Sequence, residues 1–189
     1  DTLYGDRGED VLNAGDGDDV LRGSHDDDVL NGGAGNDNLR GDDGDDNLRG
    51  DDGDDLINAG AGDDIIRGGR GDDLIDRGFG DGSDIIYDFK AGAGSEDVID
   101  LQDSGFVDFA DMVANGLSEV GRDSVITFAD GVTLTLYRIR NDKLHEDDFT
   151  FENNIPADID LLNTSVLENV PGGVVGDIVV TDPTVGDTA

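Results

Sequence analysis

The sequence predicts an all-β protein whose first half is a solenoid of short strands and tight turns. Two observations predict this fold: a nine-residue period that runs from Gly5 to about Tyr87, and a composition rich in turn-forming residues. Of the 189 residues, 30 are Gly, and 47 are Asp or Glu against only 12 Lys or Arg. Gly and Asp at this density are typical of turns rather than of helical surfaces.

Each nine-residue unit follows the pattern G-G-x-G-x-D-x-U-x, where U is a large aliphatic residue. The units run over residues 5–13, 14–22, 23–31, 32–40, 41–49, 50–58, 59–67 and 68–76, and a ninth, 79–87, follows a two-residue insertion. The sixth position is always Asp, at Asp10, Asp19, Asp28, Asp37, Asp46, Asp55, Asp64, Asp73 and Asp84. The eighth is always Leu or Ile, at Leu12, Leu21, Leu30, Leu39, Leu48, Ile57, Ile66, Ile75 and Ile86. We expect six residues of each unit to form a turn and three to form a strand with the aliphatic side chain inward.

One buried side chain per unit cannot fold alone, so the units must stack. Two units make one coil of 18 residues, which places the turns of units two apart on the same side. An ion between such turns would contact Asp carboxylates 18 residues apart, as in the pairs Asp10 with Asp28, Asp19 with Asp37, and Asp46 with Asp64. Coordination by oxygen alone suits calcium, whereas soft transition metals favour His or Cys, and the chain has no Cys.

These units resemble the calcium-binding nonapeptide repeats of the repeats-in-toxin (RTX) family, whose fold is a parallel β-roll. The resemblance implies six-oxygen calcium sites, in which backbone carbonyls at positions two and four of one turn, and at positions one and three of the next, join the two Asp side chains. Between the fourth and sixth units it implies the ligands Gly33, Gly35 and Asp37 with Gly50, Asp52 and Asp55. Elsewhere it implies the carbonyls of Gly15, Gly17, Gly44, Gly53, Gly60, Gly62, Gly68 and Gly71. Nine units taken two apart allow up to seven calcium ions.

We expect two departures from the repeat pattern to affect the calcium sites. The third unit has Ser24 and Asp26 where Gly is usual, so we expect its turn to be distorted and its carbonyls to be poorer ligands. The insertion at Arg77 and Gly78 puts the last pair, Asp64 with Asp84, in doubt.

The formal net charge of −35 excludes nucleic acids and anionic membranes as partners. It also raises the alternative of a disordered polyanion, which is how most long charge runs behave. A random acidic chain would not hold Asp and an aliphatic residue two positions apart through nine units. Without calcium, however, stacked carboxylates repel each other, and the energy of ion binding becomes folding energy. We therefore expect a switch that is disordered at low calcium and rolled at high calcium.

Residues 88–152 differ in composition from the repeats, because Gly is sparse and short aliphatic runs appear. We expect strands at residues 84–89, 97–101, 124–128 and 132–136, the last two forming a hairpin, and a short helix at 109–117. The run that begins at Asp88 resembles the C-terminal cap of the same family, which covers the last coil of the roll. Asp88, Asp97 and Asp100 allow another ion site, although solvation of strand ends is the favoured interpretation.

Residues 153–189 resemble the opening strands of bacterial cadherin-like repeats, a partial β-sandwich segment. The resemblance rests on an S-V-x-E-N motif at residues 165–169 and a T-D-P turn at 181–183. It implies Glu168 and Asp182 as candidate calcium ligands between domains.

The catalytic motifs tested do not fit, so we expect no enzyme activity in the chain itself. There is no G-x-S-x-G elbow, and the H-E-x-x-H zinc motif that starts at His145 ends in Phe149. The turn at Asp43 lacks the Gly and the final Glu of an EF-hand loop. Paired carboxylates alone do not indicate a glycosidase, because ion binding already explains them.

Two functions remain open at this stage. One is a calcium-dependent folding module of a large secreted protein, for which the RTX resemblance implies export by a bacterial type I secretion system. The other is a calcium-rigidified segment of a cell-surface adhesin, whose other domains would bind a host or surface ligand. The absence of Cys fits an extracellular or cell-surface location in which calcium replaces disulfides. The chain has no signal peptide and no apolar run long enough to insert into a membrane.

Overall fold

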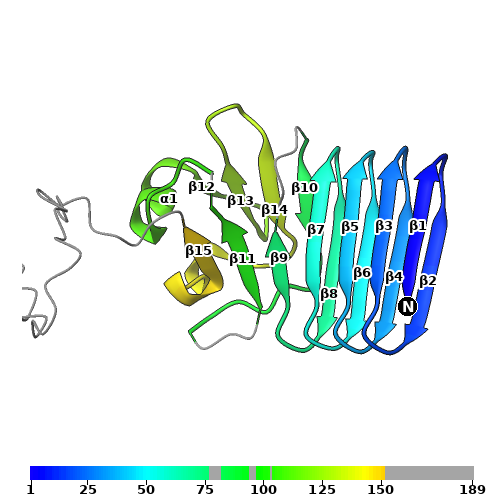
Figure 1. Ribbon diagram of the computed structural model, residues 1–189. Helices are drawn as coiled ribbons and strands as arrows, with labels where there is room; N and C mark the ends of the chain where they lie inside the picture. Colours follow the sequence, from blue (N-terminus) through cyan, green and yellow to red (C-terminus); the bar gives the residue numbers. More distant parts are fainter. Residues whose placement is uncertain (77–81, 94–96, 103, 152–189) are drawn as a thin grey trace, which may run out of the picture. The chain divides into compact units, whose positions relative to one another are not determined.

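The computed structural model describes residues 1–76, 82–93, 97–102 and 104–151, which form a parallel β-roll with a cap at its C-terminal end (Figure 1). All of them belong to one unit of the chain, Asp1–Glu152, which is separate from a second unit, Asn153–Ala189. The interpretation of residues 153–189 as a cadherin-like segment, with Glu168 and Asp182, lies outside the described residues.

Eight six-residue strands build the roll and alternate between two sheets. They are β1 (Thr2–Arg7), β2 (Val11–Asp16), β3 (Val20–His25), β4 (Val29–Ala34), β5 (Asn38–Asp43), β6 (Asn47–Asp52), β7 (Leu56–Ala61) and β8 (Ile65–Arg70). The shorter β9 (Leu74–Asp76) and β10 (Asp84–Ile86) follow. The odd-numbered strands β1 to β9 lie side by side in one sheet, and the even-numbered strands β2 to β10 lie side by side in the other. Strands two apart pair in parallel with Leu12 opposite Leu30 and Leu21 opposite Leu39, which confirms the predicted fold and its coil of two units.

A single line of aliphatic side chains fills the space between the two sheets. The eighth-position residues from the second unit onward are 0–1% exposed, namely Leu21, Leu30, Leu39, Leu48, Ile57, Ile66, Ile75 and Ile86. Leu12 is partly buried and packs against this core. Each strand contributes only this side chain and the Gly or Ala two residues later, such as Ala59, which is also fully buried. The core is therefore narrow, and one aliphatic residue per unit supplies most of it.

The strands are longer than predicted, and the turns are correspondingly shorter. The parallel pairing continues through the first three positions of the next unit, with Gly15 opposite Gly33 and Asp16 opposite Ala34. The second position of each of these units takes a positive φ, which is 118° at Gly33. This left-handed residue bends the chain while its neighbours stay in the ladder, so only three residues remain for the turn.

The third unit is not distorted, contrary to expectation. Ser24 and Asp26 have φ values of 94° and 72°, in the same left-handed region as Gly33 and Gly35 of the next unit. Ser24 also keeps its place in the ladder, opposite Asp42. Pairing with the neighbouring coils holds these residues in a conformation that costs about 1–2 kcal/mol per non-glycine residue.

The cap extends both sheets. It contains β11 (Val98–Leu101), α1 (Phe109–Asn115), β12 (Leu117–Val120), β13 (Asp123–Thr127), β14 (Thr133–Leu136), two 3₁₀ turns (Asn141–Lys143 and Glu146–Asp148) and β15 (Phe149–Phe151). The predicted hairpin is confirmed as antiparallel β13 and β14, and the predicted helix as α1. The strands β12 and β15 were not predicted from the sequence. Because β14 pairs with β10 and β15 pairs with β11, the cap covers the last coil of each sheet.

The described residues contain no helix that is long and apolar enough to span a membrane.

Candidate metal centre

The sixth-position Asp residues form two columns, one along each edge of the roll where the chain passes from one sheet to the other. Each carboxylate after the first in its column accepts a hydrogen bond through Oδ1 from the main-chain N–H of the Asp in the preceding coil, at 2.7–3.4 Å. The first column is Asp10, Asp28, Asp46, Asp64 and Asp84. The second column is Asp19, Asp37, Asp55, Asp73 and Asp97. The structure thus brings together the carboxylates that the nine-residue period predicted to stack.

The last member of each column differs from the expectation. Asp84 accepts from Asp64 N at 3.1 Å although the two residues are 20 apart, so the insertion does not prevent this pair from stacking. Asp97 accepts from Asp73 N at 3.4 Å and is only 2% exposed. Its favoured interpretation as a solvated strand end is therefore wrong. Asp88, by contrast, is exposed and accepts a hydrogen bond from Gly68 N.

The second carboxylate oxygen of eight column residues is buried without a hydrogen-bond partner in the described part of the chain. These atoms are Oδ2 of Asp10, Asp19, Asp28, Asp37, Asp46, Asp55, Asp64 and Asp73. A buried acceptor that lacks a partner costs about 1–3 kcal/mol, and more when it is charged. A row of them is stable only if protons or cations satisfy the oxygens.

Backbone carbonyl oxygens lie close to these orphaned oxygens. A point beside the Cα of Gly41, where a side chain would begin, lies 2.2 Å from both Asp46 Oδ2 and the carbonyl oxygen of Ala59 in the next coil. The corresponding point at Gly50 lies 2.0 Å from Asp55 Oδ2 and 2.6 Å from the carbonyl oxygen of Gly68. Carboxylate and carbonyl oxygens are the donors that calcium prefers. The residues present therefore fit calcium between stacked turns.

The glycines implied as carbonyl ligands also stack coil on coil. The carbonyl oxygen of Gly35 would lie 2.0 Å from a Cβ placed on Gly53, so Gly53 itself has no room for a side chain. The carbonyl of Asp52 accepts a hydrogen bond from Gly35 N at 2.8 Å, so it already takes part in the backbone ladder. Other implied glycines stack in the same way, with the carbonyl oxygen of one residue close to the Cα of the glycine one coil later. The stacked pairs and series are Gly15 with Gly33, Asp42 with Gly60, Gly44 with Gly62, and Gly17, Gly35, Gly53 and Gly71.

No group of three His, Cys, Asp or Glu side chains in the described ranges is arranged to hold a metal ion. Each turn site instead has two column carboxylates, such as Asp37 and Asp55, and must draw its other oxygens from the backbone. A site of this kind depends on the turn conformation and not on a cluster of side chains.

Burial raises the pKa of six carboxylates in the middle of the columns. The pKa rises to about 7 at Asp46, Asp55 and Asp64 and to about 6 at Asp73, chiefly through loss of solvation. A hydrogen bond from the preceding Asp N–H lowers each pKa, while the charges of neighbouring column residues raise it. The pKa of Asp28 rises for the same reasons. Near neutral pH, a bound cation would take the place of these protons.

A second ladder of side chains at position five was missed from the sequence. The main-chain N–H of Asn36 donates to Asp18 Oδ1 at 2.9 Å, and that of Asp45 donates to Asp27 Oδ1 at 2.9 Å. The same bond repeats from Asp54, Asp63, Asp72 and Ser83 to the residue one coil earlier, at 2.7–3.1 Å. These side chains are exposed and satisfy the N–H groups of the turns. The signal was present in the sequence, since position five is Asp or Asn from the second unit to the eighth.

Comparison with known proteins agrees with this geometry. Residues 1–25, 23–57, 40–75 and 49–86 match the RTX calcium-binding nonapeptide repeat in four copies. The solution structure of the AlgE6R2 subunit of the mannuronan C5-epimerase from Azotobacter vinelandii is 28% identical, with a TM-score of 0.53 over 71% of this chain and 94% of that chain. The AlgE6R3 subunit of that epimerase is also 28% identical, with a TM-score of 0.53 over 86% of this chain and 93% of its own. A search of curated protein sequences finds no match.

The first half of the chain thus consists of RTX repeats folded as a calcium-binding β-roll.

Proposed function

We propose that the roll is a calcium-dependent folding module of a large secreted bacterial protein and that it has no catalytic activity of its own. One observation carries the proposal: eight buried carboxylate oxygens at the turns lack a hydrogen-bond partner in the described residues. Calcium bound between the turns would neutralise these carboxylates and hold stacked coils together.

The switch has a physical basis: the apolar core of the roll supplies less free energy than backbone ordering and carboxylate repulsion cost. Each unit buries one aliphatic side chain, which supplies about 1.5–3 kcal/mol. Ordering the backbone of nine residues costs about 1–2 kcal/mol for each residue. Hydrogen bonds offset part of this cost, but the column carboxylates repel each other. Ion binding then supplies the missing folding energy, as in other small domains that are unfolded without their metal.

Such a switch suits a protein that crosses an export channel unfolded. Calcium is scarce inside the cell, and extracellular calcium sites typically have affinities of about 10⁻⁴–10⁻³ M. A chain with this affinity would stay unfolded before export and fold outside. The absence of Cys is consistent with this route, which for RTX proteins is the type I secretion system.

The alternative is a calcium-rigidified segment of a cell-surface adhesin. The motif Ser165-Val166-Leu167-Glu168-Asn169, which resembles a cadherin-like repeat, favours it. The AlgE6R2 and AlgE6R3 structures are subunits of an epimerase, which favours a module attached to an enzyme. The sequence of the whole parent protein separates the two: tandem cadherin-like domains indicate the adhesin, and a catalytic domain indicates the enzyme.

A calcium titration of the chelated protein, followed by far-UV circular dichroism, tests the proposal. We expect a disordered spectrum that becomes β-rich at sub-millimolar to millimolar calcium. Magnesium is the control, and it should not induce the change, because it demands near-ideal octahedral geometry at shorter distances and gives up its water molecules reluctantly. A β-rich spectrum already complete in chelator would reject the folding switch and leave calcium as a stabilising ligand.

A further inference from the structure

The second Asp column ends differently from the way it begins. Its earlier members, such as Asp37 and Asp55, have an orphaned Oδ2, but both oxygens of Asp97 are occupied. Asp97 Oδ1 accepts from Asp73 N and from the ammonium group of Lys90, each at 3.4 Å. Asp97 Oδ2 accepts from the main-chain N–H of Lys90 at 2.8 Å. The series of orphaned oxygens therefore stops where Lys90 enters the column.

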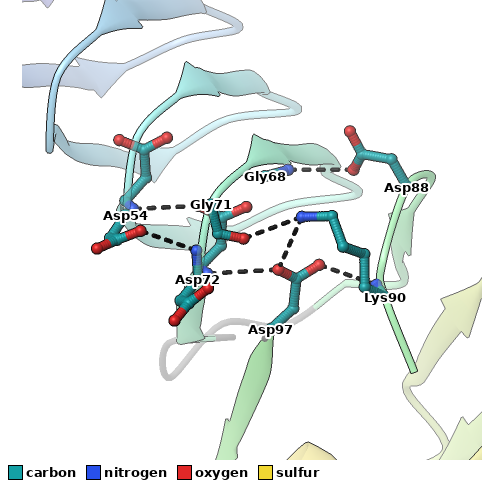
Figure 2. Close-up of polar contacts among 9 residues, drawn as sticks. Asp54, Gly68, Gly71, Asp72, Asp88, Lys90 and Asp97 are labelled. Carbon is teal, nitrogen blue, oxygen red and sulfur yellow. Dashed lines mark hydrogen bonds and ion pairs between the residues drawn. The ribbon is translucent and has the colours of Figure 1, made fainter. Parts of the chain in front are cut away.

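The ammonium group of Lys90 also reaches a backbone oxygen of the last regular turn. It donates to the carbonyl of Gly71 at 2.9 Å (Figure 2). Gly71 is the fourth position of its unit, whose carbonyl is an implied calcium ligand. The Lys90 side chain is 39% exposed, whereas the Asp97 side chain is 3% exposed. Lys90 Nζ thus lies between a turn carbonyl and a column carboxylate, the two kinds of oxygen that a calcium ion would use at this point.

We propose that Lys90 is a built-in cation that takes the place of the last calcium ion in the second column and so ends the column at the cap. The inference rests on the calcium binding proposed for the roll. An ammonium group carries a compact charge with three donors, so it can join the same oxygens without a full coordination shell. The junction between roll and cap consequently carries a compensating positive charge at any calcium concentration.

The electrostatics of the column agree with this role. Lys90 Nζ forms an ion pair with Asp97 Oδ1, on the last carboxylate of the second column. Four arginines on the roll pair with carboxylates outside the columns, for example Arg49 with Asp51. Lys90 therefore compensates part of the negative charge at the position where the column meets the cap.

Calcium stoichiometry of the full chain tests the proposal. Equilibrium dialysis against saturating calcium, with metal analysis of the protein, should give one more bound ion for Lys90→Ala than for the wild type, because Ala removes the cation and leaves space. Lys90→Met fills the space without a charge, so it should bind the wild-type number of ions and melt at a lower temperature. The matched control is Lys143→Ala, whose exposed ammonium group lies 4.0 Å from Asp142 at the surface of the cap.

The outcomes separate this inference from the proposed function. An unchanged ion count in Lys90→Ala, or a wild-type melting temperature in Lys90→Met, would overturn the role of Lys90 while leaving the calcium roll intact. Failure of the wild type to bind calcium would instead reject the calcium-dependent function itself.

Discussion

The roll and the cap bury polar groups in opposite ways. In the roll, eight carboxylate oxygens are buried without a hydrogen-bond partner in the described residues. In the cap, the buried carboxylate of Asp148 accepts hydrogen bonds from Gly92 N at 2.9 Å and His145 N at 2.7 Å. The buried hydroxyl of Ser124 similarly donates to the carbonyl of Ile139 at 3.0 Å. The cap therefore satisfies these buried groups with its own backbone, whereas the roll leaves buried oxygens that bound calcium would satisfy.

The apolar interiors of the roll and the cap also differ. The roll contains one line of Leu and Ile side chains, while the cap packs larger residues against one another. The rings of Phe109 and Phe149 stack with centroids 5.9 Å apart, and those of Phe106 and Phe128 lie 5.8 Å apart. Aromatic pairs of this kind add about 0.5–1.5 kcal/mol beyond the area that they bury. Packing between large side chains thus stabilises the cap, whereas each unit of the roll adds one aliphatic side chain to a narrow core.

The largest expected effect is the response of the two regions to chelation. Amide hydrogen exchange of the wild type should show loss of protection throughout β1 to β8 when calcium is removed. Protection in β13 and β14 should decline less, because their antiparallel hairpin and aromatic contacts do not involve a column carboxylate. Equal loss in both regions would show that the roll and the cap fold as one cooperative unit, and the comparison would then fail.

Acidification of the calcium-free protein should partly replace the ion. The pKa of Asp46, Asp55 and Asp64 is about 7 in the folded state, above the unfolded value of 3.8, so the folded chain binds more protons than the unfolded chain. The destabilisation by these groups is therefore fully present above pH 7 and is relieved as the pH falls from about 7 to about 4. Far-UV circular dichroism in chelator should show increasing β structure over this range.

A triple variant tests whether these three carboxylates cause the pH response. Asp46→Asn, Asp55→Asn and Asp64→Asn together keep the Oδ1 acceptor for the neighbouring N–H but remove the charge. The triple variant should be more β-rich than the wild type in chelator at pH 7.5 and should respond less to acid. A pH profile identical to that of the wild type would assign the response to the overall net charge of −35 instead.

Substitution of one mid-column carboxylate should lower calcium binding by more than one ion. Asp46 accepts from Asp28 N, and its own N–H donates to Asp64 Oδ1, so it faces a turn site on each side. Asp46→Ala should therefore bind about two ions fewer, a loss of about 5 kcal/mol when calcium exceeds its Kd a hundredfold. Isothermal titration calorimetry gives the ion count, and thermal melting at fixed calcium gives the stability.

A cap substitution provides the matched control for that loss. Phe149 is buried and contacts the rings of Phe109 and Phe151. Phe149→Ala should cost about 3–5 kcal/mol, as is typical of a deleted core aromatic, while the number of bound ions stays at the wild-type value. If Phe149→Ala also lost ions, the cap would have to shape the turn sites directly.

The repeat pattern made the roll predictable, because strict spacing at positions six and eight determines both the column and the core. The hairpin of the cap was also predictable, since Ala129-Asp130-Gly131 separates two strand-like runs. The role of Asp97 was not predictable, because it is 24 residues from Asp73 and lies outside the nine-residue period. Its place in the column depends on the path of the intervening chain, and so does the contact of Lys90 with Gly71.

The strands β12 and β15 were missed for a related reason. Each is short, and each forms by pairing with a partner distant in sequence: β15 pairs with β11, which places Phe149 opposite Ile99. Local propensity carries little information about such strands, since tertiary pairing decides them. The prediction of a distorted turn at Ser24 and Asp26 was wrong for a different reason. It relied on the preference for Gly at these positions, but strand pairing with the neighbouring coils holds both residues in the regular conformation.

The smallest predicted effect tests that ladder. Ser24 has a φ of 94° and lies between Asp6 and Asp42 in the parallel pairing of its sheet. Ser24→Gly removes the cost of a left-handed non-glycine residue, about 1–2 kcal/mol, but increases the entropy of the unfolded chain, which offsets about 0.4–1 kcal/mol. The variant should be more stable by about 1 kcal/mol or less, visible as a small rise in melting temperature in saturating calcium with an unchanged ion count. A fall in melting temperature would mean that the Ser24 side chain itself stabilises the turn, and that the third unit is adapted to its departure from the repeat pattern.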